Sequence, residues 1–180
     1  MKTFFKSILI IVLVIIAFPL VTGLFIEKDY AVEKQIKINR PVAEVFDYVV
    51  HIKHLQEEWG TWVDKDPNAQ HTYTGTDGTV GFTASWKSEN PDVGAGTQEI
   101  TNIIPNERVD IEISFTEPFE SKSPVYFTTE AQDGGTLVKW GMKGHMPYPT
   151  NSLLLFMDLE QMIGKDFQEG LGNLKEVMEQ

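Results

Sequence analysis

The sequence contains no cysteine among its 180 residues. Without a thiol the chain forms no disulfide and has no cysteine nucleophile, no thiolate ligand for zinc and no lipidated cysteine. It also lacks the short motifs of several enzyme classes: there is no Gly-x-Ser-x-Gly elbow, no phosphate-binding loop and no dinucleotide-binding fingerprint. We therefore predict no bound cofactor, and the redox compartment stays open.

Basic residues are few compared with acidic ones. The chain has 15 Lys and Arg against 26 Asp and Glu, which gives a formal net charge of −11. Lys2 and Lys6 are the only charges in the first 26 residues, so the remaining body carries 13 basic and 26 acidic side chains, a net charge of −13. Nucleic acids and anionic lipid headgroups select basic surfaces, and this balance argues against both as partners. An acidic surface instead favours solubility.

One long apolar run stands at the N-terminus. Residues 8–26 are apolar except for Thr22, and these 19 residues would rise about 28 Å as a helix. That length is close to the roughly 30 Å hydrocarbon core of a bilayer. We predict a transmembrane anchor at residues 1–27, followed by a folded domain at 28–180. A cleaved signal peptide is the alternative, because a Val-Thr-Gly sequence near the end of the run is a fair cleavage site.

The charges that flank this run predict its orientation. Lys2 and Lys6 precede the apolar residues, whereas Glu27 and Asp29 follow them. Because positive flanks stay on the cytoplasmic side, we expect a single-pass protein whose domain is extracytoplasmic.

Most of the body shows the two-residue alternation of β-strands. Apolar and polar residues alternate at residues 32–38, 80–86, 109–115 and 138–142. Clean alternation is typical of an antiparallel sheet with one wet and one buried face. Two short helices are predicted at residues 41–49 and 51–58, between the first strand and the rest. The order of one strand, two short helices, about six strands and one long helix predicts an α+β fold.

The chain ends in a predicted long amphipathic helix, from Ser152 to Met178. Its apolar residues recur at steps of three, four and seven, at Phe156, Ile163, Phe167, Leu171, Leu174 and Met178. Such a helix would span roughly 40 Å. Glu160 falls within this apolar stripe, and glycines at 164, 170 and 172 thin it. An acid and three glycines suit a lid over a cavity better than the centre of a solid core.

Over residues 31–179 these features together resemble the START-domain/polyketide-cyclase (SRPBCC, helix-grip) superfamily. The match rests on the opening strand with Arg-Pro-Val-Ala-Glu-Val-Phe-Asp at 40–47, Trp-Gly-Thr-Trp at 59–62 with Asp66-Pro67 after it, the hairpin series, and Met-Ile-Gly-Lys-Asp-Phe at 162–167. The resemblance implies a curved antiparallel sheet that wraps the C-terminal helix and encloses an apolar cavity. Its members include lipid carriers, small-molecule binders and aromatic-polyketide cyclases. The N-terminal anchor departs from the many soluble members.

Large side chains phased toward the inside of the sheet are the candidate pocket lining. They are Trp59, Trp62, Tyr73, Phe82, Trp86, Phe115, Phe127, Trp140, Met142, Phe156, Glu160 and Phe167. For any single member of this set, ordinary core packing is the competing interpretation.

Glu160 is the candidate catalytic residue. A carboxylate that faces an apolar cavity would have a raised pKa and would serve as an acid, a base or a ligand for a polar group. Lys34 is phased inward on the first strand as well. The alternative is that the first turns of the helix project beyond the sheet and leave Glu160 in water. Tyr73 and His145 are further polar groups that would orient a ligand.

A metal site is the weaker interpretation of a second cluster. His51, His54 and Glu58 share one helical face at i, i+3 and i+7, a spacing compatible with three zinc ligands. Polar side chains on one face of a short helix are more often simply solvated, and we predict no metal.

The sequence therefore predicts membrane-tethered binding of a hydrophobic small molecule or lipid in an internal cavity. A cyclase- or dehydratase-like enzyme, with Glu160 and a histidine as its acid–base pair, is one alternative. An acidic module that binds a basic protein partner is another.

Overall fold

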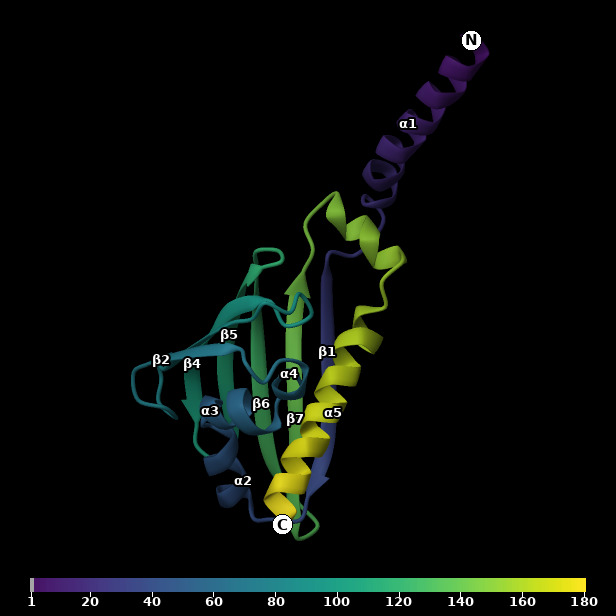
Figure 1. The fold of residues 1–180 in the computed structure, drawn as a ribbon. Coiled ribbons are helices and arrows are strands. Elements are labelled where there is room, and N and C mark those ends of the chain that lie inside the picture. Colours follow the sequence, from purple (N-terminus) through teal and green to yellow (C-terminus); the bar gives the residue numbers. More distant parts are fainter. Residues whose placement is uncertain (1) are drawn as a thin grey trace.

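The computed structural model describes residues 2–180 as a curved sheet with helices on one face and a projecting N-terminal helix (Figure 1). The elements run in the order α1 (Lys2–Thr22), β1 (Asp29–Ile38), α2 (Val42–Val49), α3 (Ile52–His54), the π-helical turn η1 (Leu55–Trp59), α4 (Thr61–Lys65), β2 (Gln70–Thr74), β3 (Thr83–Lys87), β4 (Ala95–Ile104), β5 (Arg108–Glu117), β6 (Ser121–Gln132), β7 (Gly135–His145), the 3₁₀ helix η2 (Thr150–Leu155) and α5 (Leu159–Glu179). This is the α+β helix-grip arrangement that the sequence predicts.

The seven strands form one antiparallel sheet in the order β1-β7-β6-β5-β4-β3-β2. The predicted alternation is confirmed in most strands, because Val109, Ile111 and Ile113 of β5 are buried while Glu112 is exposed. Val80 is an exception. It was phased inward but is exposed, because β3 begins only at residue 83 and the preceding residues form a turn.

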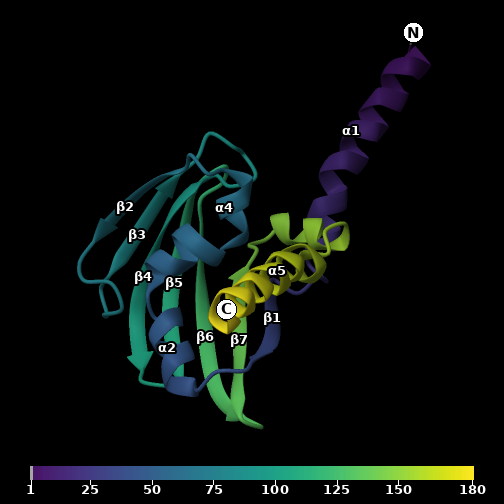
Figure 2. The same cartoon turned by 60° about the horizontal axis from the view of Figure 1, so that its bottom comes forward.

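Helices α2, α4 and α5 lie on the concave face of the sheet (Figure 2). α5 packs along β1, while α2 packs against β6 and β7. At its C-terminal end α5 is tied to the β1–α2 connection: the Asn39 amide donates to Glu179 Oε1 at 2.7 Å, and Arg40 Nε donates to the Met178 carbonyl at 2.7 Å. These bonds fix the helix along the sheet.

The long final helix predicted at 152–178 is wrong at its start. The structure has the 3₁₀ helix η2, a break, and then α5, which begins after Asp158. The Asp158 carboxylate caps α5 by accepting from the Gln161 amide at 2.9 Å. With 21 residues α5 spans about 31 Å rather than 40 Å.

The core fills one half of the sheet face, the half farther from α1. Fully buried apolar side chains gather there from α2, the middle of the sheet and the last turns of α5, among them Val45, Ile100, Val109, Phe127, Val138, Leu171 and Leu174. Val138 lies near the β6–β7 hairpin, and the last turns of α5 lie at the same end of the sheet, where they bond to the residues that follow β1. The opposite half of the same face, nearer α1, holds the site described below.

The N-terminal helix α1 projects away from the domain (Figure 1). Its segment Phe4–Thr22 is long and apolar enough to cross a membrane and is not buried by the rest of the chain. The apolar helix therefore lies four residues earlier than the run predicted at 8–26. Its length and composition fit either a membrane anchor or a signal sequence.

Candidate functional site

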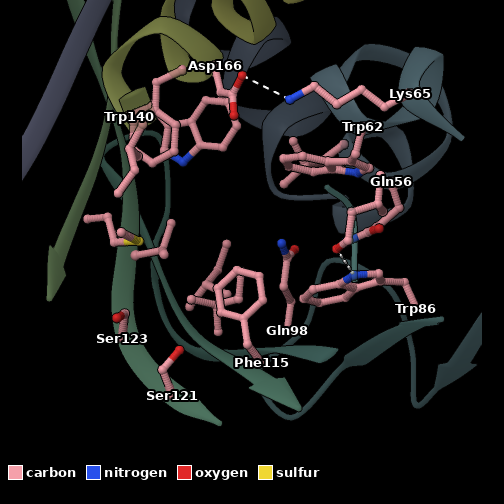
Figure 3. A pocket seen from close by; sticks show the side chains of 18 of the residues that line it. Gln56, Trp62, Lys65, Trp86, Gln98, Phe115, Ser121, Ser123, Trp140 and Asp166 are labelled. Atoms are coloured by element: carbon pink, nitrogen blue, oxygen red, sulfur yellow. Dashed lines mark hydrogen bonds and ion pairs between the residues drawn. The ribbon is translucent and has the colours of Figure 1, made fainter. Parts of the chain in front are cut away.

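A cavity of about 270 Å³ lies between the sheet and the helices, in the half of the domain nearer α1 (Figure 3). Strands β4 to β7 provide its floor, α4 and η1 one wall, and the first half of α5 another. Its volume is near the lower end of the range of small-molecule pockets.

Aromatic rings form most of the walls. Trp140 stacks on Phe167 of α5, with ring centroids 4.1 Å apart and planes 10° from parallel. Trp86 meets Phe115 edge to face at 5.6 Å. Trp62 of α4 closes the top of the chamber in Figure 3, and aliphatic residues complete the floor at Ile111, Ile113, Val125 and Met142. The interior is therefore mainly apolar.

Four polar atoms of the lining are buried without a hydrogen-bond partner in the described structure. They are the side-chain carbonyl oxygens of Gln56 and Gln98 and the indole N–H groups of Trp62 and Trp140. Gln56 is 2 % exposed and Gln98 is 5 % exposed. By contrast, the Trp86 N–H donates to the Val93 carbonyl at 3.2 Å. Because an unpaired buried polar group destabilises the fold, these four atoms suit a ligand or water that pairs with them.

Charged and exposed residues surround the mouth of the cavity. Lys65 Nζ and Asp166 Oδ1 are 3.0 Å apart and join α4 to α5 across one side. Asp92, in the β3–β4 connection, and Ser121, at the start of β6, are exposed on the other side. Both sides of the mouth lie at the end of the sheet nearer α1, because the start of β6 lies beside the C-terminal end of β7.

Half of the predicted pocket residues lie in the wall of this cavity. They are Trp62, Trp86, Phe115, Trp140, Met142 and Phe167. Three others are core residues behind the wall: Trp59, Phe82 and Phe127 are buried but do not line the cavity. Trp59 contacts Phe127 and Trp140 edge to face and so supports the wall from behind. Whether the lining residues bind a ligand stays a prediction.

Tyr73 also lies outside this cavity. Its ring stacks on Phe82 at 6.0 Å, and its hydroxyl donates to Glu57 Oε1 at 2.6 Å. Burial, followed by this hydrogen bond, raises the pKa of the Tyr73 phenol well above its usual value. The phenol is therefore already paired and does not point at the chamber.

The placement predicted for Phe156 and Glu160 in the pocket is wrong. Phe156 is 72 % exposed and precedes α5, with its ring 5.9 Å from that of Phe18 in α1. The Glu160 side chain is 75 % exposed and lies 4.0 Å from Lys34 Nζ. The first turn of α5 projects beyond the cavity, which is the alternative that leaves Glu160 in water.

The structure does not bring Glu160 and a histidine together in this cavity, because none of the residues that line it is a histidine. His145 Nδ1 instead lies 2.6 Å from Asp29 Oδ1 on the exposed surface.

The second histidine cluster does not converge either. His51 Nδ1 lies 3.3 Å from Asp77 Oδ2, whereas His54 stacks on Tyr48 and lies 3.9 Å from Glu58. Residues 2–180 contain no group of three or more side chains placed to hold a metal ion.

The polar lining residues Gln56, Gln98, Ser121 and Ser123 were missed in the sequence. Gln98 precedes Ile100 by two residues, and Ser123 precedes Val125 by two, so both have the inward phase of their strands. A polar residue in the buried register of a strand was the available signal.

Residues 30–179 match the family described as "Polyketide cyclase / dehydrase and lipid transport". The chain belongs to this family. The fold of the family supports hydrophobic-ligand binding or cyclase-like roles in general, which agrees with an apolar cavity. No curated protein matches the chain.

Solved structures of similar fold come from diverse proteins. Protein CV1439 of Chromobacterium violaceum has a TM-score of 0.59 at 12 % identity, with 83 % of this chain and 97 % of that chain covered. The Aha1 dimer of Colwellia psychrerythraea has a TM-score of 0.56 at 15 % identity, with 83 % and 96 % covered. DynU16, from the dynemicin biosynthetic locus, has a TM-score of 0.56 at 16 % identity, with 83 % of this chain but 47 % of that chain covered. At these identities the likeness concerns the fold alone.

Proposed function

We propose that this family member is a membrane-tethered binding protein that holds one hydrophobic small molecule or lipid chain in the cavity beside Trp140. The observation that carries the proposal is the pairing of an apolar aromatic chamber with four buried, unpaired polar atoms. In a dry, empty chamber the side-chain carbonyls of Gln56 and Gln98 would have no hydrogen-bond partner, whereas a bound molecule would supply one.

The polar atoms define the chemistry of the ligand. Glutamine carbonyl oxygens accept hydrogen bonds and indole N–H groups donate them, so the ligand should offer both a donor and an acceptor. A hydroxyl or a neutral amide does so. The rest of the ligand should be an alkyl chain or a fused ring system, stabilised by about 25 cal/mol for each Å² of apolar surface buried.

The titratable groups of the lining favour binding over catalysis. Lys65 and Asp166 are paired with each other at the mouth, and Asp92 is exposed there. Tyr30 is also at this end, and burial raises the pKa of its phenol. General acid–base catalysis works best with a group whose pKa lies near the working pH, and a phenol with a raised pKa is poorly suited to it.

The tether is the second part of the proposal. α1 is apolar over Phe4–Thr22, and no residue of its apolar window is buried by the rest of the chain. Those properties fit a helix that crosses the bilayer, and in this proposal it stays uncleaved and keeps the acidic domain beside the membrane.

Native mass spectrometry of the full chain, released from detergent, tests the binding proposal. We expect a mass above that of the polypeptide, lost after organic extraction, that corresponds to one apolar molecule per chain. Ser123→Leu, which fills the chamber, should abolish this excess mass. Ser114→Leu, on the opposite face of the neighbouring strand, is the matched control and should retain it. A chain that folds and carries no apolar molecule, even after incubation with lipid extract, would contradict the proposal.

A further inference from the structure

An exposed apolar segment connects β7 to the first turns of α5. It comprises Leu153, Leu155, Phe156, Met157 and Met162, whose exposed fractions range from 37 % to 72 %. We call these five residues the strap. Five large apolar side chains exposed within ten residues form a surface that typically meets a membrane or another protein.

Hydrogen bonds hold this segment against the C-terminal end of α1. The fully buried Asn151 side chain donates from Nδ2 to the Gly23 carbonyl at 2.8 Å and to the Ile26 carbonyl at 2.9 Å. The Tyr148 hydroxyl donates to the Leu20 carbonyl at 3.1 Å. The strap therefore has a fixed place at the point where the apolar helix leaves the domain (Figure 1).

The mouth of the cavity lies at the same end of the domain. Tyr30 of the lining pairs with Gly144 at the end of β7, and it also borders a surface hollow together with Leu155, Phe156 and Met157 of the strap. Phe119, at the tip of the β5–β6 hairpin, is 81 % exposed at this end as well. The hairpin tip rises in Figure 1 toward the side of the domain from which α1 emerges.

We infer that the strap lies in the boundary between headgroups and acyl chains of the membrane that α1 crosses, and that the cavity exchanges its ligand directly with that membrane. The inference rests on the proposed function, and it adds the source of the ligand and the surface that reaches it. A helix that crosses the bilayer places its end at the interface, and Asn151 fixes the strap to that end.

Charge argues that a zwitterionic bilayer is the partner. The body carries a net charge of −13, so anionic headgroups would repel it. The five strap residues are uncharged, and the two acidic residues between them, Asp158 and Glu160, would add to this repulsion. Contact should therefore depend on apolar burial, and raising the salt concentration should leave it unchanged.

Depth measurement by spin labelling tests the inference on the full chain in phosphatidylcholine nanodiscs. Because the chain has no cysteine, each single substitution carries the only label. Phe156→Cys reports on the strap, Val12→Cys on the middle of α1, and Ala131→Cys on the far end of β6 as the water-exposed control. Collisions with oxygen and with a water-soluble nickel chelate are compared at each site.

We expect the label at position 156 to collide with oxygen more than with nickel, the label at position 12 to do so more strongly, and the label at position 131 to show the reverse. A label at 156 that behaves like the one at 131 would overturn the inference. In that case the label at position 12 separates the two failures. If this label lies in lipid, α1 crosses the membrane but the strap does not contact it. If it lies in water, the membrane tether of the proposed function fails too.

Ligand exchange gives a second readout. The double variant Leu155→Ser/Phe156→Ser should slow the quenching of tryptophan fluorescence by a bromine-terminated undecyl alcohol on the order of tenfold, because the path from lipid to mouth is interrupted. Equilibrium quenching should be unchanged, since neither residue lines the cavity. Ile104→Ser, an exposed apolar residue at the opposite end of the sheet, is the control. An unchanged rate in the double variant would count against direct exchange with the membrane.

Discussion

In the proposed function, Gln98 is a residue that binds the ligand at the expense of stability. It is buried at an inward position of β4, with its side-chain oxygen unpaired. At this position a leucine would remove an unsatisfied carbonyl and add apolar surface. Where the native residue gives a less stable fold than an apolar residue would, a role in binding explains why the polar residue is present.

Gln98→Leu should therefore raise the free energy of unfolding by about 1 kcal/mol in urea denaturation of the ligand-free protein. The same variant should bind an alkyl alcohol roughly tenfold more weakly, because one hydrogen bond is lost. Gln132→Leu, on the exposed end of β6, is the control and should change neither quantity. A less stable variant would mean that the Gln98 amide is satisfied within the fold.

The hydrogen bond between Tyr126 and Glu33, on the face of the sheet away from the helices, predicts a pH dependence of stability. Its hydroxyl donates to Glu33, and burial together with this bond raises the pKa of the Tyr126 phenol to about 12 from 10.0. Since the folded pKa is the higher one, the neutral phenol stabilises the fold below pH 10, and this contribution is lost as the pH rises through about 12.

Phenolate absorbance at high pH measures this directly. Tyr126→Phe should remove a tyrosine that ionises near pH 12, and Glu33→Gln should let Tyr126 ionise at lower pH. Stability measured in denaturant should fall less steeply above pH 10 in Tyr126→Phe than in the parent chain. Equal slopes would show that the Tyr126–Glu33 bond does not form in solution.

At the residue scale, the sequence predicts burial better than it predicts orientation toward a cavity. Strand phase correctly placed Trp86, Trp140 and Met142 inward. Phase cannot distinguish a wall residue from one behind it, and Phe127 has the same phase as the wall yet packs against Trp59. Which inward positions border a cavity depends on how far the helices cover the sheet, and no local pattern encodes that distance.

Helix α5 shows at the element scale how a glycine makes room. A Cβ at Gly170 would lie 2.9 Å from Trp140 Cζ3, whereas a Cβ at Gly172 would meet nothing within 4 Å. Gly164 lies under the flexible Lys34 side chain, whose Cε would be 2.5 Å from an added Cβ. Of these three glycines, Gly170 is thus the one required by a rigid ring of the cavity wall.

Gly170→Ala should destabilise the fold by about 1–2 kcal/mol, because Trp140 is held by its stack on Phe167 and cannot move freely. Gly172→Ala is the matched control two residues away in the same helix, and it should stabilise by up to about 1 kcal/mol through helix propensity. Thermal or urea unfolding of both variants checks the difference in sign. Equal stabilisation by both would contradict the close packing of α5 on Trp140.

The start of α5 was readable in the sequence but was placed too early. Asp158 with Gln161 three residues later is a capping signature, and the structure uses Asp158 as the cap. Phe156 extended the helical periodicity backward, although it is apolar for another reason. With Leu153, Leu155 and Met157 it forms an exposed surface beside α1. Periodicity reports where apolar residues lie and not what covers them.

On the scale of the whole molecule, the domain divides into a packed half and a hollow half. α2 and the last turns of α5 fill the half of the concave face that is farther from α1, whereas only α4, η1 and the first half of α5 cover the half nearer to it. The α+β architecture followed from strand alternation and the closing helix. The position of the hollow did not, because it depends on where short helices end and where α5 begins.

The division of the molecule places the cavity, its mouth, the strap and α1 at one end. That shared location supports our proposal that α1 holds the cavity beside the membrane from which the ligand would come.

Tryptophan quenching by a bromine-terminated undecyl alcohol tests the central claim most directly, because three of the four tryptophans line the cavity. We predict saturable quenching at one alcohol per chain, retained in Ser114→Leu and lost in Ser123→Leu, with both variants folded by circular dichroism. Quenching that rises without saturation, or that persists equally in Ser123→Leu, would show that the alcohol does not occupy this cavity and would contradict the account.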